Sequence, residues 1–220
     1  MKEKFKDLTI EEKEERFNGL VYYANKIKNK SLRNVCTNIL NDYKEELSCR
    51  GAGHDGIEKF KYNRTHQCFD GGLLDHLLNV TKISYNIALT YEKDVDMDLV
   101  LFGAILHDLG KVKIFDKYDK NNEIHSNLNY NYLLVDHVYI GEKIVEEYLS
   151  KEDISDKLKC QALHIIATHM DTLDKHMAEA YIVSYADEID AYIENIISYP
   201  RNSINPLFNT YFYESDNSDK

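Results

Sequence analysis

Proline and glycine are scarce in this chain, which has 2 prolines and 9 glycines among its 220 residues. Both residues interrupt helices, so their scarcity leaves long stretches that can stay helical. Apolar residues recur along these stretches with a period of about 3.6 residues, the period of an α-helix. The sequence therefore predicts an all-α protein, and its length suits one domain with a sizeable core.

Three further absences narrow the class of protein. The 4 cysteines include no CxxC pair, which argues against a zinc ribbon or a disulfide framework. The longest apolar runs, such as residues 99–106, are far shorter than the roughly 20 residues that span a bilayer. The first residues also lack the apolar core of a signal peptide. These features predict reduced thiols, no membrane partner and a cytoplasmic location.

Basic residues are outnumbered, because 27 Lys and Arg stand against 38 Asp and Glu for a net charge of −11. Non-specific nucleic-acid binding depends on Lys and Arg side chains that neutralise phosphates. An acidic surface therefore opposes a long nucleic-acid footprint. Bound metal ions can reverse the sign of the charge inside a cleft, so a nucleotide or the end of a strand remains a possible ligand.

The helical pattern suggests a simple order of segments. A capping box at Thr9-Ile-Glu-Glu predicts a first helix to about residue 28, and Ser31 is expected to cap a second helix to about residue 47. Later helices are expected over 73–91, 98–107, from 137, over 158–168 and over 175–198, with long loops over 48–70 and 112–134. We expect a helical extension over residues 1–30, the main domain over 31–200 and a polar tail over 201–220.

The last predicted helix carries two apolar strips. The main apolar face is expected to comprise Ile182, Ala186, Ile189, Ile193 and Ile196. Asp187 lies on the second strip, among small apolar residues. A carboxylate in such surroundings needs a partner, because burying it unpaired costs several kcal/mol.

The adjacent residues His107 and Asp108, within Gly-Ala-Ile-Leu-His-Asp-Leu-Gly-Lys (103–111), offer one nitrogen and one carboxylate ligand to a divalent metal. The second carboxylate oxygen can bridge to another ion. Gly110 follows at the usual place for a helix to end, so the backbone can bend there. Further candidate ligands lie on helix-like apolar stretches: His76, His137, His164, His169 and Asp187.

The order of these residues resembles the HD superfamily of metal-dependent phosphohydrolases. The segments 71–76, 107–111, 136–141, 164–169 and 185–191 are similar to the HD domain of the YhaM-type 3′–5′ exoribonucleases, and the likeness covers about residues 25–198. Two departures stand out. Met170 occupies the position after His169 where those enzymes usually have a second histidine, and the chain offers no segment for their N-terminal OB domain.

The resemblance implies a single helical bundle of the HD type with the metal site in its core. A first site would comprise His76, His107, Asp108 and Asp187. A second ion would share Asp108 and take His137 and His169, while His164 is left open between a metal ligand and a phosphate contact. The implied cofactor is one or two divalent ions, Mn²⁺ or Fe²⁺ first, with Zn²⁺, Co²⁺, Ni²⁺ or Mg²⁺ as alternatives.

Asp108 and Lys111 are the candidate catalytic residues. Lys111 completes His-Asp-x-x-Lys and can steady an anionic phosphate, although a lysine at a helix end also interacts favourably with the helix dipole. Arg64 and His66 lie in the loop before Gly71-Gly72 and are candidates, with Lys111, for binding substrate. The alternative, to which we give equal weight, is that Arg64 and His66 are ordinary solvated residues of this loop.

The function implied is hydrolysis of a phosphodiester by a metal-activated water. The substrate would be a nucleotide or the 3′ end of single-stranded nucleic acid. One alternative is a nucleotidase or (d)NTP phosphohydrolase, which the acidic composition favours. The other is a non-catalytic nucleotide-binding regulator, which the intact His-Asp-x-x-Lys motif disfavours. The sequence gives no oligomeric state.

Overall fold

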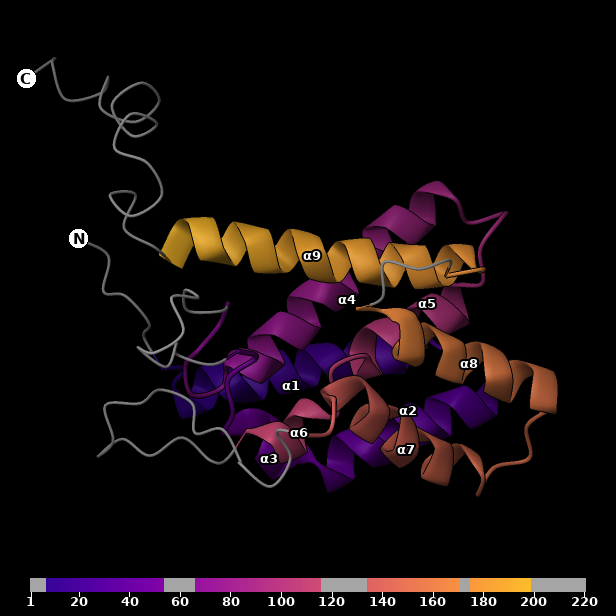
Figure 1. The fold of residues 1–220 in the computed structure, drawn as a ribbon, viewed down its shortest axis with the longest axis horizontal. Coiled ribbons are helices and arrows are strands. Elements are labelled where there is room, and N and C mark those ends of the chain that lie inside the picture. Colours follow the sequence, from indigo (N-terminus) through magenta and orange to yellow (C-terminus); the bar gives the residue numbers. More distant parts are fainter. Residues whose placement is uncertain (1–6, 54–65, 116–133, 171–174, 199–220) are drawn as a thin grey trace, which may run out of the picture.

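The computed structural model describes residues 7–53, 66–115, 134–170 and 175–198, with side chains to residue 194 in the last helix. These parts form nine α-helices and contain no β-strand, so the prediction of an all-α fold is confirmed (Figure 1). The helices are α1 Ile10–Ala24, α2 Lys30–Asp42, α3 Lys44–Ser48, α4 Gly72–Thr90, α5 Met97–Leu106, α6 Lys111–Ile114, α7 His137–Leu149, α8 Asp156–Thr168 and α9 Ala178–Ser198.

Helix α5 lies at the centre of the bundle and packs against α1, α2, α4, α8 and α9. Its residues from Leu99 to Leu106 are all buried. A helix that is apolar on every side is stable only when other helices surround it. Because α5 leads directly into His107 and Asp108, this burial carries the two residues into the core.

Local signals explain most helix starts. Thr9 and Glu12 form the predicted capping box of α1, and Asp136 caps α7 through the backbone N–H of Val138. The predicted cap of the second helix was wrong. Asn29 accepts the hydrogen bond from the backbone N–H of Leu32, so α2 begins before Ser31. Helix α2 then ends at Asp42, and α3 follows as a separate short helix.

The buried face of α9 also differs from the predicted one. Ile189 and Ile193 are 40% and 49% exposed. The buried face instead comprises Ala180, Ile182, Val183, Ala186, Asp187 and Asp190, together with Ser184. Small residues on this face let α9 lie across α4 and α5, and the buried carboxylates find partners there (Figure 1). The side chain of Ile196 lies outside the described residues.

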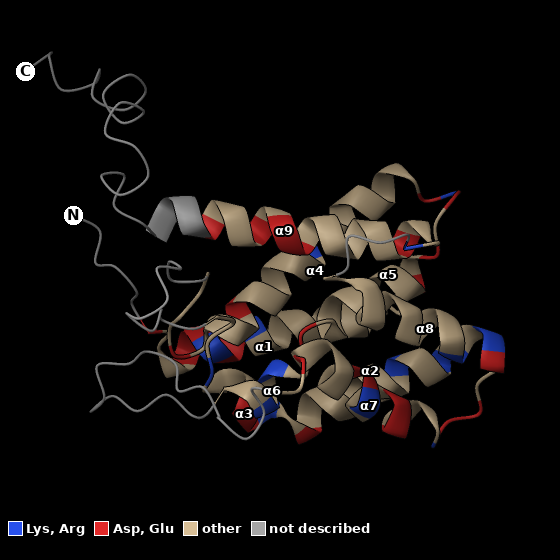
Figure 2. Ribbon diagram, viewed as in Figure 1, with Lys and Arg blue, Asp and Glu red and all other residues tan. Residues whose placement is uncertain are grey.

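Charge is distributed unevenly over the described helices. Helix α9 carries acidic residues and no lysine or arginine (Figure 2). Helix α6 is basic at Lys111 and Lys113, and it extends into the start of the loop predicted over 112–134. Among the described residues, no helix combines the length and apolar character needed to cross a bilayer.

Candidate metal centre

Five helices bring the candidate ligands together in the core. His76 lies on α4, His107 follows α5, His137 begins α7, His169 follows α8 and Asp187 lies on α9. Asp108, directly after α5, lies between them and is 1% exposed. One group of possible ligand atoms comprises His66, His76 and Asp190, and the predicted ligands form two more; within each group the ligand atoms lie within 4.8 Å of one another. Two of the three consist of predicted ligands alone. We call them the first cluster (His76, His107, Asp108 and Asp187) and the second cluster (Asp108, His137 and His169).

The first cluster centres on Nε2 of His76. This nitrogen lies 3.2 Å from Oδ2 of Asp108 and 3.1 Å from Oδ1 of Asp187. Nε2 of His107 lies 3.3 Å from the same nitrogen of His76. Two imidazoles and two carboxylates thus direct four ligand atoms at one point, which suits a transition metal with mixed nitrogen and oxygen ligands.

The second cluster uses the other oxygen of Asp108. Oδ1 lies 3.3 Å from Nε2 of His137 and 3.5 Å from Nε2 of His169. Neither nitrogen nor this oxygen has a hydrogen-bond partner within the described parts of the chain. Buried polar atoms are normally satisfied, so three such atoms facing one another fit a bound cation.

The four cluster histidines share one orientation. Nδ1 of His107 lies 3.0 Å from the carbonyl oxygen of Ala104, and Nδ1 of His169 lies 2.7 Å from that of Ile166. A carbonyl oxygen only accepts hydrogen bonds, so each Nδ1 carries the proton. In His76 and His137 a carboxylate, from Asp190 and Asp136 respectively, takes the same place. All four rings therefore direct Nε2 at the clusters, the arrangement in which a ligand histidine is held by an outer acceptor.

Electrostatics keep most of these groups in the state that binds a cation. Burial opposes the charge of Asp108, but Lys111 and His107 hold the pKa of that carboxyl well below its usual range. Burial lowers the pKa of His107 to about 4, so the ring is neutral at pH 7. Burial also opposes the charge of His76, yet hydrogen bonds to carboxylates, those of Asp108 and Asp187 foremost, raise its pKa well above the ordinary value in the metal-free protein.

Lys111 lies directly beside the clusters. Its ammonium group contacts Oδ2 of Asp108 and its side chain is 11% exposed. The contact of Lys111 to an anion stays a prediction. Helix α6 has only four residues, so Lys111 lies in its first and its last turn and the helix-end alternative stays open.

Three other predicted site residues have different placements. Nε2 of His164 contacts the backbone carbonyl of Lys175, and the ring stacks on His176 at 6.1 Å, so His164 belongs to neither cluster. The ring of His66 contacts that of His76, with the ring centres 4.5 Å apart and the planes inclined at 47°. Arg64 lies outside the described residues. Met170, the departure noted in the sequence, is 58% exposed and therefore points away from the core.

Sequence reasoning missed two buried residues beside the first cluster. Asp190 lies one helical turn after Asp187, and its Oδ2 is 2.7 Å from Nδ1 of His76. Gln67 is fully buried and donates to the same oxygen at 2.7 Å. The available signal for Asp190 was its spacing of three residues from Asp187, which places both on one helix face. Gln67 had no comparable signal.

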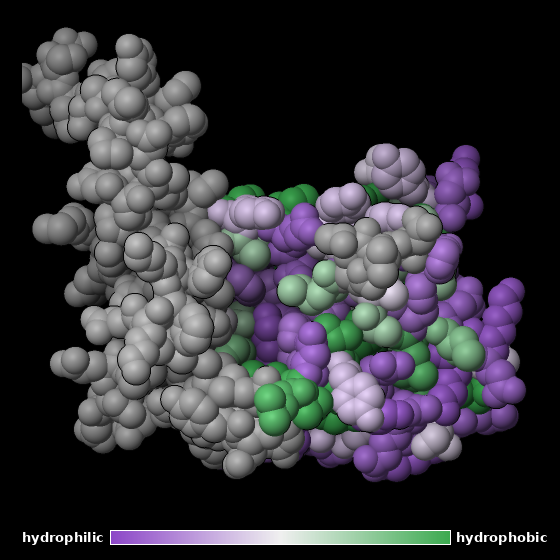
Figure 3. Space-filling view, in the orientation of Figure 1, coloured by the Kyte–Doolittle hydropathy of each residue, from purple (hydrophilic) through white to green (hydrophobic). Residues whose placement is uncertain are grey.

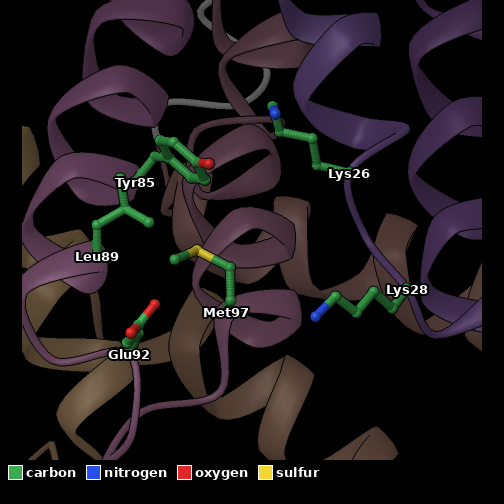
Figure 4. Close-up of a pocket in the computed structure, with 6 residues that line it drawn as sticks. All are labelled: Lys26, Lys28, Tyr85, Leu89, Glu92 and Met97. Carbon is green, nitrogen blue, oxygen red and sulfur yellow. The ribbon is translucent and has the colours of Figure 1, made fainter.

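A cavity of about 370 Å³ lies near the C-terminal end of α4, apart from the clusters (Figure 4). Its lining residues are Lys26, Lys28, Tyr85, Leu89, Glu92 and Met97. None belongs to either cluster, and with one carboxylate the cavity offers no comparable ligand set. On the face drawn in Figure 3, hydrophilic side chains line a hollow between α9 and the layer of α6 and α7.

Comparison with known proteins agrees with this geometry. Residues 73–192 match the HD domain family, which covers more than half of the chain, and the chain therefore belongs to that family. The predicted HD resemblance is confirmed.

Two curated relatives show which enzymes contain similar chains. One is a dihydroneopterin 2′,3′-cyclic phosphate phosphodiesterase of Methanocaldococcus jannaschii, 30% identical over 60% of this chain and 51% of its own length. The other is a 3′–5′ exoribonuclease YhaM of Bacillus licheniformis, 23% identical over 82% of this chain and 55% of its own. The chain thus spans about half the length of these relatives. No solved structure matches.

Proposed function

We propose that this protein is a metal-dependent phosphohydrolase that cleaves phosphodiesters. The observation that carries the proposal is the division of Asp108 between the clusters, with Oδ2 in the first and Oδ1 in the second. One carboxylate shared in this way would hold two divalent ions side by side. Such pairs stabilise both the attacking and the leaving oxygens of phosphoryl transfer.

The donor set favours a transition metal. Four imidazoles and two carboxylates suit Mn²⁺ or Fe²⁺, and Zn²⁺, Co²⁺, Ni²⁺ and Mg²⁺ are the alternatives. The first cluster offers four ligands and the second offers three, so we expect the first to bind more tightly. A bound ion would supply a Lewis acid for a phosphoryl oxygen and would lower the pKa of a water.

The protein's own residues complete the site. Lys111 places a positive charge against Asp108, where it would bind a non-bridging phosphate oxygen and stabilise the charge that develops there. The ring of His66 contacts that of His76, a ligand of the first cluster, and would contact the substrate. Arg64 is proposed for the same role on sequence alone. The burial of Asp108 and His107 excludes bulk water, which strengthens each of these interactions.

A small substrate is favoured over a long strand. The net charge of −11 opposes many contacts to a polyanion, and α9 carries no basic side chain. The relative from Methanocaldococcus jannaschii is named for a cyclic phosphodiester, which is small, and the YhaM relatives are named for exoribonuclease activity. We therefore propose a nucleotide, a cyclic phosphodiester or a short 3′ end as substrate.

The cellular setting and the domain limits are proposals of the same kind. Cys36 and Cys160 form no disulfide bond within the described residues, which supports a reducing compartment such as the cytoplasm. We place the catalytic domain at about residues 31–200. Helix α1 packs against α4 and α5, so the N-terminal segment supports the bundle directly.

One set of assays tests the proposal. Purified protein with Mn²⁺ is offered bis-p-nitrophenyl phosphate, p-nitrophenyl phosphate, 2′,3′-cyclic nucleotides, nucleoside triphosphates and a labelled single-stranded oligonucleotide. We expect the diesters to be cleaved faster than the monoester, and Asp108→Asn to abolish cleavage. Activity confined to mononucleotides and triphosphates would support a nucleotidase instead. If the protein binds metal but hydrolyses none of these substrates, the result would favour a non-catalytic nucleotide-binding regulator.

A further inference from the structure

A chain of hydrogen bonds connects His66, which lies in the loop before α4, to the imidazole ring of His76. Nδ1 of His66 lies 2.7 Å from Oε1 of Gln67. The amide nitrogen Nε2 of Gln67 donates to Oδ2 of Asp190 at 2.7 Å. The same oxygen lies 2.7 Å from Nδ1 of His76. Gln67 and His76 are fully buried and Asp190 is 5% exposed, so water does not compete for the two contacts of Asp190, whereas His66 is partly buried.

The chemistry of the four groups gives this chain one direction. A carboxylate accepts hydrogen bonds, so Asp190 receives a proton donor from Gln67 and another from His76. The amide of Gln67 then presents its oxygen to His66, which must donate from Nδ1. In the neutral ring of His66, and in the ring of His76 once an ion is bound, Nε2 therefore carries no proton. Each of these Nε2 atoms can then accept a hydrogen bond or bind a cation.

The backbone around Gln67 is built to hold its side chain in this place. Gln67 has a left-handed backbone angle, φ +41°, which a residue with a side chain rarely adopts. Its carbonyl oxygen accepts from the N–H of Ala52 at 3.1 Å and packs against Gly72. A Cβ at Gly72 would lie well within 3.0 Å of that oxygen. A strained conformation that is fixed from several sides is typical of a functional position.

We propose that Asp190 and Gln67 are positioning residues, which fix the proton of His76 and of His66 on Nδ1 and thereby present both Nε2 atoms to the metal and the substrate. Asp190 acts on His76 directly. Gln67 acts through two hydrogen bonds: its amide nitrogen donates to the carboxylate of Asp190, and its amide oxygen accepts from Nδ1 of His66 and so orients that ring. The part that concerns His76 rests on the proposed metal function, whereas the part that concerns His66 does not.

The first test is independent of metal and of activity. In ¹⁵N-labelled, metal-free protein at neutral pH, long-range proton–nitrogen spectra report which ring nitrogen of His66 is protonated. Burial lowers the pKa of His66 to about 3, so the ring is neutral there. We expect the proton on Nδ1 in the unmutated protein. In Gln67→Asn, whose side chain is too short to reach, we expect a shift towards Nε2. Asparagine tolerates the left-handed backbone, so this variant should fold.

The second test measures the ligand. Mn²⁺ alone is titrated into the metal-free protein, and the tighter dissociation constant is compared between variants. We expect Asp190→Ala to weaken it about 10- to 100-fold, the usual effect of losing an outer partner of a ligand histidine. In the Zn²⁺-loaded unmutated protein, His76 should show a solvent-protected proton on Nδ1, and Asp190→Ala should lose that protection.

Thr81→Val is the matched control. Thr81 is fully buried on the same helix as His76 and donates to the carbonyl of Leu77 at 2.7 Å, outside the chain. This variant removes a buried hydrogen bond and should leave the His66 proton and the Mn²⁺ affinity unchanged. A proton on Nε2 of His66 in the unmutated protein, or equal Mn²⁺ affinity in Asp190→Ala, overturns the proposal. Should Asp190→Ala fail to fold, the His66 spectra of the unmutated protein and Gln67→Asn decide it. A failure of Mn²⁺ to bind the unmutated protein would contradict the proposed function while leaving the His66 result valid.

Discussion

Gly110 lies directly against the backbone of His137, at the start of α7. A Cβ built at Gly110 would lie well within 3.0 Å of the carbonyl oxygen of His137. The backbone of Gly110 is ordinary, with φ −62°. The glycine is therefore required for close approach between the two backbones, rather than for a left-handed helix end.

We expect Gly110→Ala to lower the free energy of unfolding by about 2–3 kcal/mol, because the added methyl group overpacks a contact between two backbones. Helix α7 would have to move away, so His137 would leave the second cluster. Chemical denaturation measures the first effect. Titration with Mn²⁺ measures the second, which should appear as loss of the weaker binding step.

Gly141→Ala is the control, since Gly141 faces the same contact from α7. A Cβ there would lie 3.1 Å from the backbone nitrogen of Gly110, a much milder approach. Alanine also favours a helix over glycine by about 1 kcal/mol. The two effects should nearly cancel. Equal destabilisation by both variants would contradict the account.

The sequence predicted much of this site because its signals are local. Period and capping located most helices, and the likeness to the HD family selected the six residues that the structure brings together. Their role as ligands remains a prediction. What could not be predicted depends on contacts between distant segments. Nothing near Gln67 in the sequence indicates Asp190, and hydrophobicity alone did not show which strip of α9 is buried.

His164 illustrates the same limit. It follows the helical pattern and stands five residues before His169, so spacing alone kept it as a candidate ligand. In the structure its ring contacts the carbonyl of Lys175, at the start of the segment that leads into α9. That partner lies eleven residues away and belongs to no recognisable motif.

The shared position of Asp108 predicts a hierarchy of metal loss. Asp108→Asn should lose most of both ions, because each cluster loses a charged oxygen. Asp187→Asn should weaken only the first cluster, and His169→Gln only the second. Elemental analysis after dialysis, together with Mn²⁺ titration, measures the number of ions in each variant. Two tightly bound ions in Asp108→Asn would contradict a shared ligand.

Lys111 should matter for turnover and not for metal content. Lys111→Met keeps the apolar stem in its buried position and removes the charge. We expect turnover of bis-p-nitrophenyl phosphate to fall roughly 10²-fold, comparable to the loss of one oxyanion donor. Metal content should be retained, since a lysine beside Asp108 competes with a cation for the carboxylate.

Lys113→Met is the matched control for Lys111. Lys113 lies two residues further on and its ammonium group is 5.5 Å from the ring centre of Tyr43, outside both clusters. Its loss should leave turnover almost unchanged. Near-full activity in Lys111→Met would instead assign Lys111 a structural role at the start of α6.

The neutral, partly buried ring of His66 should make the metal-free protein sensitive to acid. Its pKa is about 3 in the folded protein, because burial disfavours the charged ring, and about 6.5 in an unfolded chain. Between these values the unfolded chain binds a proton that the folded protein does not. The contribution of His66 to stability is therefore fully present above pH 6.5 and is lost as the pH falls.

Replacing His66 by glutamine isolates this effect. The free energy of unfolding, measured by denaturation from about pH 4 to pH 7, should fall less steeply with acid in His66→Gln. The difference in slope should approach one proton per molecule in the middle of the range. His107, whose pKa is about 4, and His76, whose raised pKa acts in the opposite direction, titrate in both proteins. Their contributions largely cancel in the comparison, so parallel curves would mean that His66 is not held as a neutral ring.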